Sequence, residues 1–278
     1  DAVRKSLDFL EKEGYEITRL QPDGAGAIPL ERVRAALRPD TILVSLMMVN
    51  NETGAINDIA AVARMLKAEN SIALLHTDAV QGFLKVPFSA KTLGADLITI
   101  SGHKIHAPKG IGALYIRSGL KLPPYIHGGG QERGLRSGTE ATVQIAGFAR
   151  AVELRLTDYD AKLAHMAALR DYCRERLLSI PGMVPVAAGT APHILAISLA
   201  GYPSANIVTD LGAQGICISA GSACHQGKAS HVVSALGLDK RTAAGVIRIS
   251  FSPENTETDV DALYEALKAH QAARFPML

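Results

Sequence analysis

The chain has 278 residues, 47% of them hydrophobic, and a net charge of +2. This length and apolar content suffice for a large core in one or two domains. The nearly neutral charge gives no reason to expect nucleic acid or an anionic membrane as a partner, and no apolar run reaches the roughly 18 residues of a membrane span. Three cysteines are too few for a disulfide framework, which favours a cytoplasmic protein with reduced thiols.

Residues 2–13 have the apolar spacing of an amphipathic helix, with Asp1 as its N-cap. No signal-peptide pattern precedes this helix, and the chain lacks an initiator methionine. We therefore expect the chain to begin inside a domain, after an N-terminal truncation.

Apolar runs of strand length alternate with helical patterns between residues 41 and 116. The run at 41–48 is almost continuously apolar, as in a strand that is buried on both faces. The alternation predicts an α/β fold with a mostly parallel sheet covered by helices. We expect strands at 41–48, 71–76, 96–100 and 111–116, and a helix at 58–69.

The pattern changes at about residue 158, after a helix expected at 140–155. Strands and helices are segregated beyond this point, which predicts a smaller α+β domain. We therefore expect a large domain at 1–158 and a small C-terminal domain at 159–278. The elements expected in the second part are helices at 159–179, 204–211, 231–236 and 257–269, and strands at 194–199, 216–219 and 246–251.

Polar residues follow three of the expected strands of the large domain. Asn50-Asn51-Glu52 follows the first strand, Asp78 and Gln81 follow the second, and Ser101-Gly102-His103-Lys104 follows the third. Open α/β sheets bind ligands outside the carboxyl ends of their strands. These three clusters are therefore expected to converge on one crevice.

Lys104 and Asp78 indicate the chemistry of this crevice. Most lysines are exposed, so Lys104 alone is most simply a surface residue, but an amine held in a cleft can form an imine with a carbonyl cofactor. Pyridoxal phosphate (PLP) needs a carboxylate against its pyridinium nitrogen. Asp78 could supply it, although taken alone this residue is as simply a helix N-cap. Gln81 could donate to the ring oxygen.

Ser101 and His103 flank a glycine directly before Lys104. Their side chains could bind a phosphate, with Gly102 allowing close approach of the backbone. The alternative for His103 is a packed loop histidine. His103 and His106 are spaced like a metal pair, but no third ligand is evident, so we expect no metal site.

Cys224 lies in a loop of small residues, 220–227, where nothing builds a core. A thiol on such a loop indicates a nucleophile. Cys173, in a helix, and Cys217, in a strand, are instead expected to be buried. Arg248 is a charge within an apolar strand, and a substrate carboxylate could balance it with two hydrogen bonds.

Several motifs, in order along the chain, resemble those of cysteine desulfurases of the NifS/IscS type in the class V aminotransferase family. They are VNNETG (49–54), HTDAVQ (76–81), SGHKIHAPKG (101–110) and GGGQERGLRSGT (128–139). GSAC (221–224) resembles the catalytic loop of the family's first group. The resemblance implies the PLP-dependent transferase fold type I, with a mostly parallel large domain and a smaller α+β C-terminal domain.

The resemblance also implies PLP as the cofactor and a role for each residue around it. Lys104 holds PLP and moves protons, while Asp78 pairs with the pyridine nitrogen. Gln81 contacts the ring oxygen. Ser101 and His103 bind the phosphate.

The remaining roles that the resemblance implies concern the substrate and the partner subunit. Asn51 contacts the ring oxygen and lies near the substrate carboxylate, which Arg248 holds. Cys224 attacks the sulfur of L-cysteine, which leaves L-alanine and a persulfide whose sulfur passes to an acceptor protein for iron–sulfur cluster or thio-cofactor synthesis. Thr139 binds the phosphate of the partner subunit, which implies a homodimer with shared sites.

Two features depart from the family's pattern. A cofactor-stacking histidine is expected just before Asp1 and a phosphate-binding turn further upstream, so an incomplete and inactive fragment is one alternative. His225 follows Cys224 as in selenocysteine lyases, which makes selenocysteine lyase or another class V reaction a second alternative. A nucleotide-binding loop at Gly128–Gly130 is a third, but this stretch lacks the phosphate-loop pattern.

Overall fold

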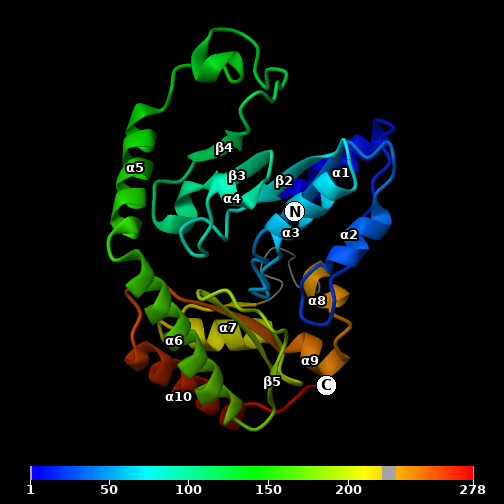
Figure 1. The fold of residues 1–278 in the computed structure, drawn as a ribbon. Coiled ribbons are helices and arrows are strands. Elements are labelled where there is room, and N and C mark those ends of the chain that lie inside the picture. The colour runs from blue at the N-terminus through cyan, green and yellow to red at the C-terminus, as the bar shows by residue number, and fades with distance from the viewer. Residues whose placement is uncertain (1, 221–229, 278) are drawn as a thin grey trace.

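The computed structural model describes residues 2–220 and 230–277, and it contains two four-stranded sheets, one above the other in Figure 1. The strand order is β1-β2-β3-β4 in the first sheet and β5-β6-β8-β7 in the second. Cys224 and His225 lie outside the described residues, as does the expected N-cap Asp1.

The first sheet is mostly parallel, as expected. Its strands are β1 (Leu43–Met47), β2 (Leu74–Asp78), β3 (Leu97–Ser101) and β4 (Gly112–Ile116). The first three are parallel and β4 is antiparallel to β3. The register pairs Asp78 with both Met47 and Thr99, so three carboxyl ends lie side by side.

Helix α3 (Ile59–Ala68) packs against one side of this sheet and contributes to the core there. It begins where the carboxylate of Asp58 accepts a hydrogen bond from Ala61 N at 2.8 Å, as an N-cap does. Its apolar side chains recur at helical spacing and pack with Leu75 and Ile98. The other helices of this part are α1 (Ala2–Lys12), α2 (Leu30–Ala36) and α4 (Ala90–Leu93).

Two expectations about these strands were wrong in detail. Residues 41–48 are not buried on both faces, since Leu43 is 41% exposed and Met47 is 39% exposed. Along β2, buried and half-buried side chains alternate, so within the described chain the core covers mainly one face. The strand β2 begins later than expected because Ser71 still closes the turn after α3, where its N–H donates to Leu66 O.

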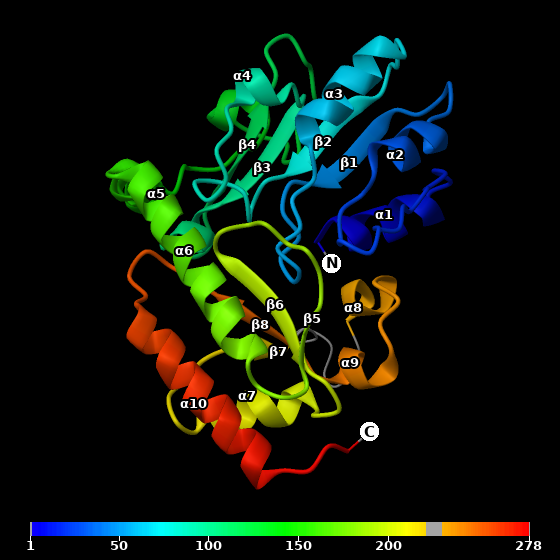
Figure 2. The ribbon, with the colours of Figure 1, turned by 60° about the horizontal axis from the view of Figure 1, so that its bottom comes forward.

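The second sheet is entirely antiparallel and forms the expected α+β part. Its strands are β5 (Met183–Pro185), β6 (Ile194–Leu199), β8 (Val246–Ser250) and β7 (Ser219–Ala220). Helices α6 (Tyr159–Leu178), α7 (Ser204–Gly212) and α10 (Glu257–Ala273) share one core with it (Figure 2). The short helices α8 (His231–Ala235) and α9 (Lys240–Ala244) lie beside a smaller cluster around Val233 and Val246.

The two described cysteines differ in burial. Cys173 lies in the core as expected, and burial raises the pKa of its thiol to about 12. Cys217 is exposed, so the expectation that it is buried was wrong. The strand β7 begins only at Ser219, and the side chains of Ile216 and Ile218 pack against the core, which turns the residue between them outward.

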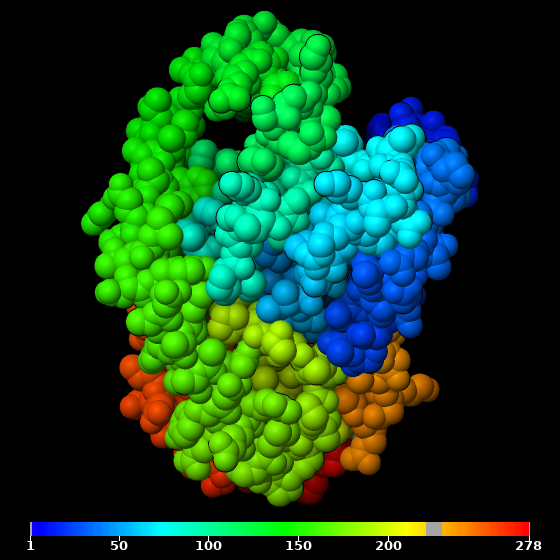
Figure 3. Space-filling view, viewed as in Figure 1, coloured from blue at the N-terminus to red at the C-terminus, as the bar shows by residue number. Residues whose placement is uncertain are grey.

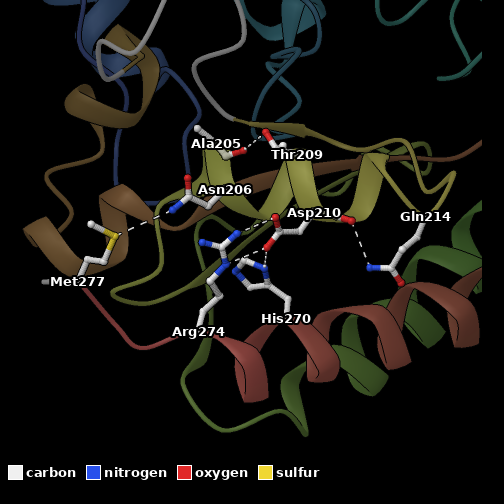
Figure 4. A network of polar contacts seen from close by, with 8 residues as sticks. All are labelled: Ala205, Asn206, Thr209, Asp210, Gln214, His270, Arg274 and Met277. Atoms are coloured by element: carbon white, nitrogen blue, oxygen red, sulfur yellow. Dashed lines mark hydrogen bonds and ion pairs between the residues drawn. The ribbon is translucent and has the colours of Figure 1, made fainter.

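Polar contacts, one of them from a buried histidine, link the C-terminal helix to α7 (Figure 4). His270 is only 4% exposed, and its Nδ1 lies 2.9 Å from the carboxylate of Asp210. Arg274, just after α10, donates to the same carboxylate at 2.9 Å. These partners, Arg274 first, lower the pKa of Asp210. The network fixes α10 against the second sheet.

Helix α5 (Thr142–Leu156) follows a segment that projects from the first sheet at the top of Figure 1 and carries the turn η2 (Gln131–Gly134). Figure 3 shows an opening between this segment and the sheet. Tyr125 is 87% exposed and Val143 is 79% exposed. The predicted domain boundary at residue 158 falls at the junction of α5 and α6, and it stays a prediction.

Candidate active site

The polar clusters at the strand ends lie at one end of the first sheet. Asp78 is the last residue of β2 and Ser101 is the last residue of β3. Asn50 follows Val49, which forms a bridge with Ile56 directly beyond β1. Since β1, β2 and β3 are parallel neighbours, these side chains share the carboxyl end of the sheet, where α/β proteins bind ligands.

Asp78 is half-buried, and one of its carboxylate oxygens accepts a hydrogen bond from Val80 N at 3.0 Å. Residues 80–85 form turns and not a helix, so the alternative of a helix N-cap was wrong. The other oxygen makes no hydrogen bond to a described residue. Asp78 can therefore still accept a hydrogen bond from a ligand.

Lys104 lies on the one-turn helix η1 (Gly102–Ile105), directly after β3. The neighbouring Ile105 is 1% exposed and packs in a small core with Ala151 of α5. A Cβ on Gly102 would lie 2.9 Å from Ile111 Cγ2, so this turn needs glycine to approach β4. Packing on both sides thus fixes the backbone that carries the half-buried Lys104 side chain.

Ser101 and His103 contact each other beside Lys104. The distance between Ser101 Oγ and His103 Nδ1 is 2.7 Å. Burial, followed by the charge of Lys104, lowers the pKa of His103. A hydroxyl and an imidazole at this position can bind a phosphate. His106 instead contacts Arg155, with 3.5 Å between Nε2 and Nη2, and no group of three possible metal ligands occurs in the described residues.

Arg248 lies in the middle of β8 and connects the second sheet to the loop after β1. Its Nη1 donates to Asn51 O at 2.8 Å, and its Nη2 donates to Ser219 Oγ at 3.1 Å. Its Nε is buried without a hydrogen-bond partner among the described residues. Protein oxygens thus accept some of the hydrogen bonds that this guanidinium can donate. The binding of a substrate carboxylate by Arg248 stays a prediction.

The loop that carries Asn51 is held closely against the second part of the chain. Ala191 N donates to Gly54 O at 3.0 Å. A Cβ on Gly189 would lie 2.0 Å from Thr53 O, so only glycine fits there. This contact keeps the backbone of Asn51 near β8, where its oxygen accepts a hydrogen bond from Arg248.

Gln81 has two buried neighbours that the sequence did not indicate. Lys85 Nζ lies 3.4 Å from Gln81 Oε1, and His193 Nε2 lies 3.3 Å from the same oxygen. Lys85 is 8% exposed and His193 is 3% exposed. Burial, together with the charges of Arg155, Lys104 and Arg248, lowers the pKa of Lys85 to about 7.

Because of this buried amine, replacing Lys85 with methionine should stabilise the cofactor-free protein. The unfolded chain binds more protons than the folded chain between about pH 7 and 10.5. The folded protein therefore pays the full cost of burying the charged Lys85 below pH 7, and this cost disappears toward pH 10.5. At 1.36 kcal/mol per pH unit the gain below pH 7 is on the order of 5 kcal/mol. Chemical denaturation at several pH values measures it.

The matched control is Lys67→Met, which removes an exposed lysine from α3. This control should leave the free energy of unfolding nearly unchanged at every pH. A Lys85→Met variant whose gain is the same at acidic and alkaline pH would contradict the lowered pKa.

Thr139 does not join these residues. It is exposed on the segment between η2 and α5. That segment lies at the top of Figure 1, at the end farthest from the second sheet and from Arg248. The structure therefore brings the other predicted site residues of the described chain together at one end of the first sheet, but it leaves Thr139 apart from them.

Comparisons with known proteins all point to the same family. A model described as aminotransferase class-V matches residues 3–263. A cysteine desulfurase from Trichormus azollae is 40% identical over 271 residues, which cover 96% of this chain and 67% of that protein. The cysteine desulfurase IscS of Clostridium botulinum (strain Hall) is 37% identical over 277 residues, which cover 96% and 68%. The chain thus spans about two thirds of the length of these relatives.

Solved structures agree with this result. A NifS-like protein superposes with a TM-score of 0.91 at 36% identity, covering 98% of this chain and 73% of that chain. DndA from Streptomyces lividans superposes with a TM-score of 0.74 at 36% identity, covering 90% and 72%. The similarity therefore extends over both sheets.

Proposed function

Because this chain belongs to the aminotransferase class-V family, we propose that it is a PLP-dependent cysteine desulfurase, which converts L-cysteine to L-alanine. The observation that carries the proposal is that Lys104 and Asp78 lie at the same end of the first sheet. An amine on a fixed turn and a carboxylate with a free oxygen lie at the ends of adjacent parallel strands.

The residues at this end of the sheet fit PLP. Asp78 has an oxygen available for the ring nitrogen, Ser101 and His103 form a polar pair suited to a phosphate, and Lys104 supplies an amine. When bound, PLP supplies a ring that accepts the electrons left after a proton is removed from the substrate Cα.

Each of these side chains would have its own role in the reaction. The amine of Lys104 would hold the cofactor covalently and, once released, would take the proton from the substrate Cα. The carboxylate of Asp78 would keep a proton on the ring nitrogen. Asn51 and the guanidinium of Arg248, which already lie in contact, would orient the substrate carboxylate.

Cys224 would accept the sulfur. Its thiolate would attack the sulfur of the substrate as the bond between that sulfur and Cβ breaks, so that L-cysteine and the Cys224 thiol become L-alanine and a persulfide. This role rests on the sequence of the loop at 220–227. The sulfur would then pass to an acceptor protein, for iron–sulfur cluster or thio-cofactor synthesis.

We also propose a homodimer, in which Thr139 reaches the phosphate of the partner subunit's cofactor. Exposed apolar side chains support this, since Tyr125 on the projecting segment and Val143 at the start of α5 are both largely exposed. A cytoplasmic location agrees with the two described cysteines, which are free thiols. None of the described helices is long and apolar enough to cross a membrane.

Incubation of the purified chain with PLP and L-cysteine tests the proposed reaction. We expect a visible absorbance band from bound PLP and release of L-alanine, with sulfide appearing when a reductant is added. L-serine, which replaces the sulfur by oxygen, should yield no alanine. Faster turnover of selenocysteine than of cysteine would instead favour a selenocysteine lyase. A protein that binds PLP but forms no alanine would contradict the proposal.

A further inference from the structure

His193 joins the second part of the chain to the end of β2. It precedes β6, and its backbone oxygen accepts a hydrogen bond from Phe251 N at 3.0 Å. Its imidazole reaches Gln81 Oε1 at 3.3 Å across 112 positions of sequence. At 3% exposure it is buried, and Gln81 is its one side-chain hydrogen-bond partner in the described chain.

The imidazole of His193 is uncharged. Burial and the positive charges of Lys85, Arg155 and Arg248 lower its pKa to about 2. A neutral imidazole has one N–H group and one bare nitrogen. The question is therefore which nitrogen carries the proton and which atom of Gln81 faces it.

The second partner of Gln81 answers this question. The ammonium form of Lys85, present below about pH 7, has three hydrogens and no lone pair, so the Gln81 atom that it contacts at 3.4 Å is then the oxygen. Above that pH the neutral amine keeps two hydrogens and can still donate to the same oxygen. The same oxygen faces His193 Nε2, which must then carry the proton, because two lone pairs would repel. The bare Nδ1 of His193 is the nitrogen that is buried without a partner in the described residues.

This arrangement orients the amide of Gln81. With its oxygen held by two buried donors, its Nε2 points away from them and keeps both hydrogens. That nitrogen makes no hydrogen bond to a described residue and is not buried. Gln81 follows β2 by three positions, at the same end of the sheet as Asp78 and Lys104.

We propose that His193 and Lys85 are positioning residues that hold Gln81 as a hydrogen-bond donor to the ring oxygen of PLP. The inference rests on the proposed function, since it needs PLP in this site. Without the two donors the amide could rotate and present its oxygen, which would repel the negatively charged ring oxygen. A donor to that oxygen stabilises its charged form, so loss of the donor shifts the protonation of bound PLP to higher pH.

Five variants of the full chain test this arrangement. His193→Leu removes the donor, whereas His193→Gln places an amide nitrogen near the position of Nε2 and His193→Asn places one near Nδ1. Gln81→Leu removes the oriented amide itself, and it is also combined with His193→Leu. The measurements are the dissociation constant of PLP and the pH midpoint of its visible absorbance change, with circular dichroism to verify folding.

We expect His193→Leu and His193→Asn to weaken PLP binding about fivefold, the value of one ordinary hydrogen bond. Both should raise the pH midpoint, and His193→Gln should restore both quantities. The double variant should match Gln81→Leu, because His193 acts through Gln81. Normal PLP binding and an unchanged midpoint in folded His193→Leu and His193→Asn would overturn the inference, as would full additivity with Gln81→Leu.

The unmodified chain separates this inference from the proposed function. If it binds no PLP, both are wrong. If it binds PLP and converts L-cysteine to L-alanine while His193→Leu is normal in both spectroscopic measurements, only the inference about His193 is wrong.

Discussion

Replacing Lys104 with alanine should lower L-cysteine turnover by roughly a thousandfold or more, the range expected when a positioned proton-transferring group is lost. Lys104 lies on η1, where buried Ile105 and the close approach at Gly102 fix the backbone. The variant should also lose the covalent attachment of PLP. Alanine release measures turnover, and mass spectrometry after borohydride reduction locates the attached cofactor.

Lys109→Ala is the matched control, since this lysine is exposed and follows in the same loop. It should keep both turnover and covalent attachment at Lys104. Attachment of PLP to any other lysine in the unmodified chain, or normal turnover by Lys104→Ala, would contradict the assignment. Lys85 is a second, buried amine near this site, so the mass of its peptide is diagnostic.

Long periodic elements could be predicted well from the sequence. The strand at 194–199 matches β6 in full, because all six of its side chains are buried and Gly201 lies shortly after it. The helix expected at 58–69 matches α3, because an acidic cap precedes regular apolar spacing. The short helices α2, α4 and α9 were not predicted, since such helices display little of their period, whereas α8, which is equally short, matches the helix expected at 231–236.

The candidate site could be predicted where it follows from the topology of the sheet. Asp78, Ser101 and Lys104 end or follow adjacent strands, and strand ends can be read from the apolar pattern. Lys85 and His193 could not be predicted, because their importance depends on a shared contact with one oxygen of Gln81. Nothing in a local sequence window reports a contact between residues 81 and 193.

Arg248 has partners in the protein that its sequence context did not predict. The sequence places a charge in an apolar strand, and an anion was the expected partner. The structure instead gives two of its nitrogens to Asn51 O and Ser219 Oγ. This guanidinium therefore ties the loop after β1 to the second sheet before any substrate binds, so its replacement would alter both the geometry of the site and the binding of a carboxylate.

Replacing Cys224 with serine should abolish alanine formation, with a loss of roughly a thousandfold or more, while PLP binding stays normal. A serine hydroxyl is ionised far less than a thiol near neutral pH, so it cannot accept sulfur as a nucleophile. Mass spectrometry of the unmodified protein after exposure to L-cysteine should find one additional sulfur on the peptide that contains Cys224. The visible absorbance of PLP provides the measure of an intact cofactor site.

The control is Cys217→Ser, because Cys217 is the exposed thiol of the described chain and precedes the same loop. Buried Cys173 is a poor competitor, since burial raises the pKa of its thiol to about 12. If Cys217→Ser loses activity and Cys224→Ser keeps it, Cys217 is the nucleophile and the assignment to Cys224 is wrong. If Cys224→Ser alone loses activity and the added sulfur, the small-residue loop carries the nucleophile and Cys217 is only a surface thiol.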